Sequence, residues 1–171
     1  MSQELQEFVD SIVAATAGLP SPATLASWDP KLSGDIDIVI QRDGSWLHGG
    51  TPIQREGLVR LFASLLRREE DGDYYLLTPV EKWRIRVEHH PLLGIDCDRS
   101  KSGEGTTWQV LLNTGGRCRI GGAHRLHVED EEPWIELPNG LSALITRAAW
   151  YRLVGEAEVL EGQAVVTSGG E

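Results

Sequence analysis

The sequence predicts an α+β protein with two small lobes, in which a strand–turn–helix motif is duplicated. Short segments alternate apolar and polar residues, as strands do, and other segments repeat apolar residues at helical spacing. In addition, residues 53–61 recur as residues 145–153, since both segments begin with Ile-x-Arg and end with Arg-Leu. Each copy follows a turn dipeptide, Asp43-Gly44 or Asn139-Gly140. We therefore expect two related lobes, in which the helices that begin at the Ile-x-Arg steps occupy equivalent positions.

We divide the chain into an N-terminal helix and connector over residues 1–25, a first lobe over 26–80 and a second lobe over 81–171. The N-terminal helix is predicted over residues 2–17, where apolar residues recur three, four and seven positions apart. A glycine and a proline after this segment end the helix.

The first lobe begins with a half-buried strand over residues 35–41, where isoleucines alternate with mostly polar residues. The Asp-Gly dipeptide turns the chain back into a second strand that ends at His48. Residues 51–54, Thr-Pro-Ile-Gln, have the cap, the proline and the glutamine of a helix start. We predict a helix from there to about Arg68, followed by a solvated turn over residues 69–73.

The second lobe is rich in strands. Alternating apolar residues predict strands over 83–88, 93–98 and 108–112, with glycine-rich turns between the later ones. Short strands closed by a final helix indicate a curved antiparallel sheet with a helix against it. Cys97 and Cys118 fall in strands, where a small buried hydrophobe is commoner than a reactive thiol.

Composition and charge limit the class of protein. Apolar residues make up 40% of the 171 positions and charged residues 25%, as in soluble globular proteins. The N-terminus lacks the basic and apolar regions of a secretory signal, so we expect none. No apolar run approaches the length of a membrane span. Two cysteines suit a reducing cytoplasm. The net charge of −10 argues against binding polymeric nucleic acid, whereas one nucleotide held by one or two arginines is compatible with it.

The motifs of common enzyme classes are missing. The sequence has no phosphate-binding loop, no complete dinucleotide fingerprint and no serine-nucleophile elbow. His124 and His127 have the spacing of metal ligands on a helix, but the glycines before them and the strand predicted after them spoil that geometry. We therefore expect no structural metal, and the sequence indicates no cofactor.

Two pairs of residues in the first lobe are candidates for a site. Asp35 and Asp37 lie on one face of the first strand, where two carboxylates can bind a cation or act in acid–base chemistry. A solvent-facing strand edge is the favoured alternative. Trp46 and His48 lie on the returning strand and can stack on a base, although core packing is the better expectation for Trp46.

Two further groups could bind an anion or line a junction. Arg55 and Arg147 each stand one step inside a predicted helix start, where free amides and an arginine suit a phosphate or carboxylate. The alternative is an internal salt bridge to Glu81 or to an aspartate of the first strand. Thr78, Glu81 and Lys82 belong to a capping-box string that we expect to connect the two lobes.

Several ordered motifs resemble the bacterial family called domain of unknown function 1285, over about residues 26–170. The motifs are Gly-Asp-Ile-Asp at 34–37, Asp-Gly-Ser-Trp-Leu-His at 43–48, Thr-Pro-Ile at 51–53, Leu-Val-Arg-Leu-Phe at 58–62, Leu-Thr-Pro-Val-Glu-Lys at 77–82 and Ala-Leu-Ile-Thr-Arg at 143–147. The resemblance implies a cytoplasmic α+β protein with an internal duplication and a second lobe superficially like a pleckstrin-homology fold. It also implies a binding site between the lobes for a nucleotide-like ligand in signalling, without catalytic activity. The chain departs from the family pattern at Gly49 and at His89-His90, where acidic residues are usual.

Two functions of different classes follow. We favour a non-enzymatic sensing or regulatory module that binds a small anionic molecule, such as a nucleotide, between the lobes. The alternative is a metal-assisted enzyme acting on a phosphorylated small molecule, with Asp35 and Asp37 as metal ligands and His48 or Glu81 as the base. The expected site draws on the candidates named above: Asp35, Asp37, Trp46, His48, Arg55, Thr78, Glu81, Lys82 and Arg147. The oligomeric state cannot be read from the sequence.

Overall fold

The computed structural model describes residues 3–15, 18–103, 105–160, 163–165 and 168, and its contacts divide the chain into two compact units. The first unit comprises Met1–His89 with Asn139–Leu141, and the second comprises His90–Pro138 with Ser142–Glu171. The boundary therefore lies later in the chain than the expected position between residues 80 and 81, because the strand that follows residue 81 belongs to the first unit.

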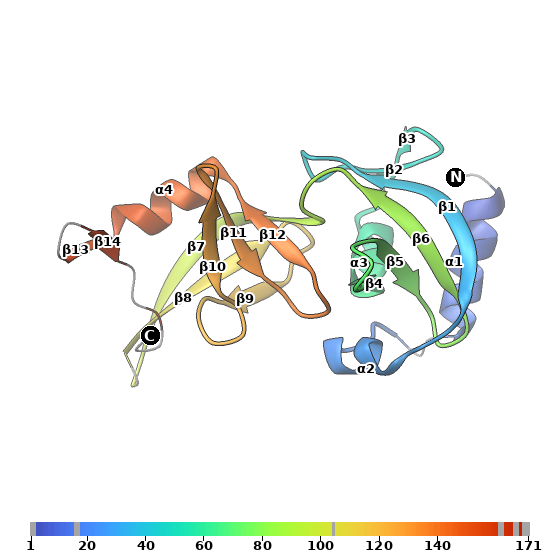
Figure 1. The fold of residues 1–171 in the computed structure, drawn as a ribbon, viewed down its shortest axis with the longest axis horizontal. Helices are drawn as coiled ribbons and strands as arrows, with labels where there is room; N and C mark the ends of the chain where they lie inside the picture. The colour runs from blue at the N-terminus through green and yellow to red at the C-terminus, as the bar shows by residue number, and fades with distance from the viewer. Residues whose placement is uncertain (1–2, 16–17, 104, 161–162, 166–167, 169–171) are drawn as a thin grey trace. The chain divides into compact units, whose positions relative to one another are not determined.

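The first unit is a mixed sheet with helices (Figure 1). In chain order it contains α1 (Gln3–Ala15), α2 (Pro22–Ser27), β1 (Leu32–Ile40), β2 (Trp46–His48), β3 (Thr51–Pro52), α3 (Glu56–Ser64), β4 (Leu66–Arg68), β5 (Tyr74–Leu77) and β6 (Lys82–Val87). The strands form one sheet in the order β3-β2-β1-β6-β5-β4. β1 and β6 run parallel, and all other neighbours are antiparallel.

Both long helices of the first unit pack on the same face of its sheet. The predicted apolar face of α1 buries Leu5, Phe8 and Ile12, whereas Val13, at the end of that face, is exposed. The Phe8 ring lies 5.8 Å from that of Phe62 in α3. Ile38 and Ile40, which belong to the alternating isoleucines of β1, are fully buried in the same core. The alternation that predicted the strand therefore also predicted which face is buried.

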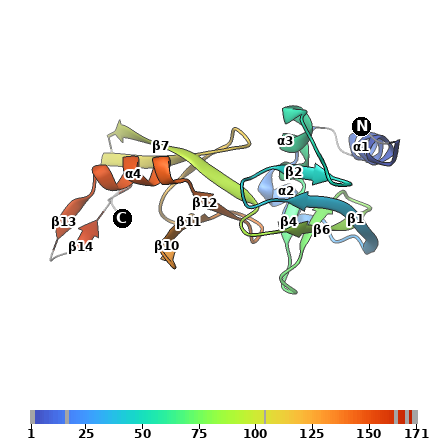
Figure 2. The same cartoon turned by 90° about the horizontal axis from the view of Figure 1, so that it is seen from above.

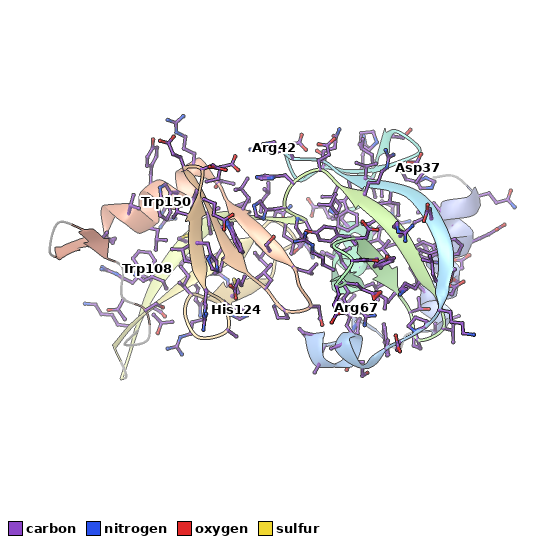
Figure 3. All side chains as sticks on the ribbon, viewed as in Figure 1. Asp37, Arg42, Arg67, Trp108, His124 and Trp150 are labelled. Carbon is purple, nitrogen blue, oxygen red and sulfur yellow. The ribbon has the colours of Figure 1, made fainter. Side chains whose placement is uncertain are left out.

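The opposite face of β5 is covered by α2, a helix that the sequence analysis did not predict. Ser21 caps it by accepting a hydrogen bond from the Thr24 amide at 3.1 Å. Leu25 of α2 packs with Tyr75 and Leu77 of β5. The guanidinium of Arg67, labelled in Figure 3, donates to the carbonyl of Trp28 at 2.7 Å just after this helix.

The second unit is also a mixed sheet with a helix. It contains β7 (Leu92–Ser102), β8 (Gly105–Leu112), β9 (Arg117–Arg119), β10 (Leu126–Glu129), β11 (Glu132–Glu136), β12 (Ser142–Ile145), α4 (Arg147–Gly155), β13 (Glu158–Leu160) and β14 (Gln163–Val165). The main sheet has the order β10-β11-β12-β7-β8-β9, and β13 pairs with β14 separately. α4 lies along β7, as Figures 1 and 2 show, and buries Ala149 and Leu153.

The two six-stranded sheets have the same topology. In each unit the first and sixth strands are parallel neighbours. The other four neighbouring pairs, first–second, second–third, sixth–fifth and fifth–fourth, are antiparallel. The order of strands within each unit is therefore 3-2-1-6-5-4 in both. The duplication that the sequence predicted is present, and it is a duplication of strand order.

The repeated nine-residue segments do not occupy equivalent places in that topology. α3 lies between the third and fourth strands of its unit, whereas α4 follows the sixth strand. The prediction that the two Ile-x-Arg helices are equivalent is therefore wrong, and so is a purely antiparallel second sheet, because β12 and β7 are parallel.

The start of α3 also differs from its prediction. Thr51 and Pro52 form β3, which pairs with β2 across a two-residue turn, and the helix begins only at Glu56. The turn residues Gly49 and Gly50 have φ angles of +56° and +79°, as a tight hairpin requires. β3 is an edge strand, and edge strands tolerate proline. Thr51 and Pro52 can therefore pair in the hairpin in spite of their helix-start pattern. The same competition ends α3 at Ser64, because the residues after it pair with β5 as β4.

No helix in the described part of the chain has the length and apolar character needed to cross a membrane.

Candidate anion-binding cleft

A cleft of about 590 Å³ lies wholly within the first unit. It is bounded by α1, by the β2–β3 hairpin and by the segment that leads into α3. Its lining residues are Leu5, His48, Gly49, Thr51, Pro52, Ile53, Gln54, Arg55 and Leu58. Two of the predicted site residues, His48 and Arg55, therefore lie in one cleft.

The β2–β3 hairpin positions His48. Its backbone pairs with Ile38 on one side and Thr51 on the other, and the side chain is half-buried. The next amide, that of Gly49, donates to the carbonyl of Asp37 at 3.0 Å, so the turn is held against β1. The left-handed Gly49-Gly50 turn then returns the chain along the cleft toward α3.

Arg55 is the N-cap residue of α3 and stands just outside the helix. Its backbone is extended, with φ −77° and ψ 105°, and its carbonyl accepts the first helical bond, from the Leu58 amide at 3.0 Å. The side chain makes no capping hydrogen bond. It is exposed, and no hydrogen bond or ion pair joins its guanidinium to any residue that the structure describes. The first-turn amides of α3 therefore keep the partial positive charge of an uncapped helix start.

Asp35 and Asp37 are on the exposed face of β1 and do not line the cleft. Each pairs with an arginine of the parallel neighbour β6: Asp35 with Arg84 at 3.4 Å and Asp37, labelled in Figure 3, with Arg86 at 3.1 Å. The side chains of both aspartates are more than half exposed. The carboxylates of Asp35 and Asp37 thus pair with arginines of β6 and not with Arg55. This agrees with the favoured interpretation, in which both aspartates face solvent on the strand. Among the described residues, no group of three metal-ligating side chains is placed to hold an ion.

Trp46 belongs to the core. It is 2% exposed, and its ring stacks on that of Phe62 at 6.2 Å between centroids. Core packing was the better expectation for this residue, and the structure confirms it. The indole is consequently not available to stack on a ligand in the cleft.

Thr78, Glu81 and Lys82 form the corner between β5 and β6. The corner lies inside the first unit, so the expectation that it connects the lobes is wrong. The buried hydroxyl of Thr78 accepts the amide of Glu81 at 3.0 Å, as the capping-box pattern predicted. Glu81 accepts the hydroxyl of Ser11 of α1 at 3.2 Å, and Lys82 pairs with Glu69 at 2.7 Å. These contacts stabilise the corner itself.

Arg147 is in the second unit, at the first residue of α4, as predicted. The N-cap is Thr146, whose hydroxyl accepts the Ala149 amide at 3.4 Å. Arg147 itself folds over its own helix: its Nε donates to the Tyr151 hydroxyl at 3.2 Å, and its guanidinium lies 5.6 Å from that ring centroid. Its predicted counterpart, Arg55, makes no such contact.

The cysteines are buried and free, as predicted. Burial, with a smaller contribution from Asp96, raises the pKa of Cys97 from 9.0 to about 11. Burial raises the pKa of Cys118 to about 11 as well. Both thiols are therefore protonated at neutral pH and are poor nucleophiles.

An aromatic stack in the second unit was not predicted from the sequence. The His127 ring stacks on Trp134 with centroids 4.2 Å apart, and the His90 ring lies 5.7 Å from the same indole. His127 also contacts a carboxylate oxygen of Glu136 at 2.6 Å. The stack of His127 on Trp134 follows from the register of β10 with β11, which places the two residues opposite each other. No local sequence motif indicates it.

Family models match nearly the whole chain. The N-terminal domain of a domain of unknown function, DUF1285, matches residues 23–90, and the DUF1285 C-terminal domain matches residues 91–171. The chain belongs to the DUF1285 family. The resemblance seen in its motifs is thus confirmed, and the junction of the two DUF1285 models falls close to the junction of the two structural units.

Two solved DUF1285 structures are similar to this chain. One is a family protein from Silicibacter pomeroyi DSS-3, with 35% identity and a TM-score of 0.82 over 95% of this chain and 91% of that one. The other, from Shewanella baltica OS155, has 30% identity and a TM-score of 0.59 over 71% of this chain and 92% of that one. No curated protein matches the chain.

Proposed function

We propose that this DUF1285 protein is a non-enzymatic ligand-sensing module and that the cleft of the first unit, between His48 and Arg55, binds a small anionic molecule. The observation that carries the proposal is Arg55. It lines the cleft at an uncapped helix start, and its exposed guanidinium has no partner among the described residues.

Charge and geometry at this point suit an anion. An arginine presents donors in a planar fork that matches two carboxylate or phosphate oxygens. Arg55 is also the N-cap residue of α3, so the partial positive charge of a helix start lies next to it. Glu56, the acidic residue beside Arg55, has its own partner in Arg60 at 3.7 Å.

The alternative salt-bridge role for Arg55 has lost its candidate acceptors. The carboxylates of Asp35 and Asp37 pair with arginines of β6, and that of Glu81 accepts the Ser11 hydroxyl. Binding is therefore a better account of this side chain than an internal ion pair.

A ligand titration monitored by amide NMR tests the proposal. Inorganic phosphate, AMP and hexanoate are added to the full-length protein, and at least one is expected to shift the amides of residues 48–58. Arg55→Ala removes charged hydrogen bonds and should weaken binding by about 10- to 100-fold. The fold should persist, because an exposed side chain without partners contributes little to stability.

Arg147→Ala is the matched control, since it removes the same charge at another helix start and should leave binding unchanged. If no anion shifts residues 48–58, or if Arg147→Ala weakens binding as much as Arg55→Ala does, the proposed site is wrong.

A further inference from the structure

The wall of the cleft beside its polar end is aliphatic. Its apolar lining residues are Leu5 of α1, Pro52 of β3, Ile53 before α3, and Leu58 of α3. The polar side chains of the lining are those of His48, Thr51, Gln54 and Arg55. Leu5 and Leu58 are 3% and 7% exposed and are anchored in the core, so this part of the wall is fixed by the packing of α1 and α3 on the sheet. An anion bound at Arg55 would therefore have an apolar surface next to it.

The cleft offers little to a nucleotide. Among its described lining residues, His48 has the only aromatic ring, because the indole of Trp46 is stacked on Phe62 in the core. Base recognition usually relies on aromatic stacking and on polar groups that meet the base edge. Among the lining residues that the structure describes, Arg55 has the only permanently cationic side chain, in a chain with a net charge of −10. One arginine balances a monoanion and leaves most of the charge of a nucleoside polyphosphate uncompensated.

We infer that the ligand is an aliphatic carboxylate, with its carboxylate at Arg55 and its hydrocarbon body against Leu5, Pro52, Ile53 and Leu58. This inference rests on the proposed function and adds the chemical class of the ligand. A carboxylate matches the planar fork of a single guanidinium. Each methylene of the hydrocarbon body that leaves water makes the free energy of binding more favourable.

A chain-length series tests the inference by calorimetry on the full-length protein. Butanoate, hexanoate and octanoate are titrated alongside AMP, inorganic phosphate and the neutral analogue 1-octanol, all below micelle-forming concentrations. Each added methylene should strengthen binding about threefold until the cleft is filled. Octanoate should bind more tightly than AMP, phosphate and 1-octanol.

Variants separate the two ends of the ligand. Arg55→Ala should weaken all the carboxylates by a similar factor and keep the dependence on chain length. Ile53→Thr keeps the branch at Cβ but makes the wall more polar, so it should weaken octanoate more than butanoate and flatten that dependence. Amide shifts at residues 48–58 show that each probe occupies this cleft.

The possible failures are distinct. If AMP or phosphate binds at residues 48–58 and affinity does not rise with chain length, the aliphatic ligand is wrong while the anion site stands. If 1-octanol binds as tightly as octanoate and Arg55→Ala has no effect, the cleft recognises the hydrocarbon chain without its charge, and the anionic ligand of the proposed function is wrong. If no probe shifts these residues, both the inference and the proposed function fail.

Discussion

Gly94 offers a sharp test of how closely β7 packs at the centre of the second sheet. This residue lies in β7, paired with Ile145 of β12 on one side and with Leu112 of β8 on the other. A Cβ added here would lie 2.6 Å from Cγ1 of Val110 and 3.1 Å from Cδ1 of Ile145. Val110 is fully buried and Ile145 is 3% exposed, so neither can move aside into solvent.

Gly94→Ala should therefore act as overpacking of a closed core, which costs about 1–3 kcal/mol. For a chain of this length that corresponds to a fall of roughly 2–12 °C in the melting temperature. Urea unfolding followed by tryptophan fluorescence measures the change in unfolding free energy. Gly116→Ala is the control, because its added Cβ would meet only Leu112 Cδ1, at 3.7 Å.

A double-mutant cycle identifies the cause. Val110→Ala removes the methyl group that the new Cβ would strike. The double variant should then be less destabilised than the sum of the two single variants, by at least about 0.5 kcal/mol. Strict additivity, or a Gly94→Ala variant as stable as the wild type, would refute the close approach of β7 and β8 at this point.

Two further outcomes follow from the same structure. Gly57→Ala should stabilise the protein by about 0.5–1 kcal/mol, as measured by urea unfolding. Gly57 is helical in α3, and an added Cβ would meet nothing within 4 Å. A loss of stability would show that the start of α3 is wrongly placed. The raised pKa values of Cys97 and Cys118, about 11 instead of 9.0, favour the folded state while the thiols are protonated. That contribution is fully present below pH 9 and is lost as pH rises through 11. The difference in unfolding free energy between the wild type and the Cys97→Ala/Cys118→Ala variant should therefore shrink over that range. A constant difference would mean that the thiols are not buried.

The local sequence pattern was sufficient to predict the helices, strands and turns whose deciding interactions involve residues close together in the chain. The alternation around Ile38 predicted β1 and its buried face, and the Asp-Gly turn predicted the return into β2. The helical periodicity of α1 predicted its buried side, and the capping-box string predicted the hydrogen bonds of Thr78. In these cases the deciding interactions are backbone propensity, side-chain periodicity and turn geometry, which a short segment contains in full.

Tertiary structure decided the features that depend on partners far apart in the chain. The nine-residue repeat was a real likeness of local sequence, but only the pairing of distant strands shows that the duplication concerns strand order. Thr51 and Pro52 have a helix-start pattern, yet a hairpin with β2 gives their backbone a better set of hydrogen bonds. Asp35 and Asp37 resembled metal ligands until the register of β1 with β6 placed an arginine beside each. The cleft likewise needs Leu5, His48 and Arg55 from three separate elements, and their meeting follows from packing, which no local pattern encodes.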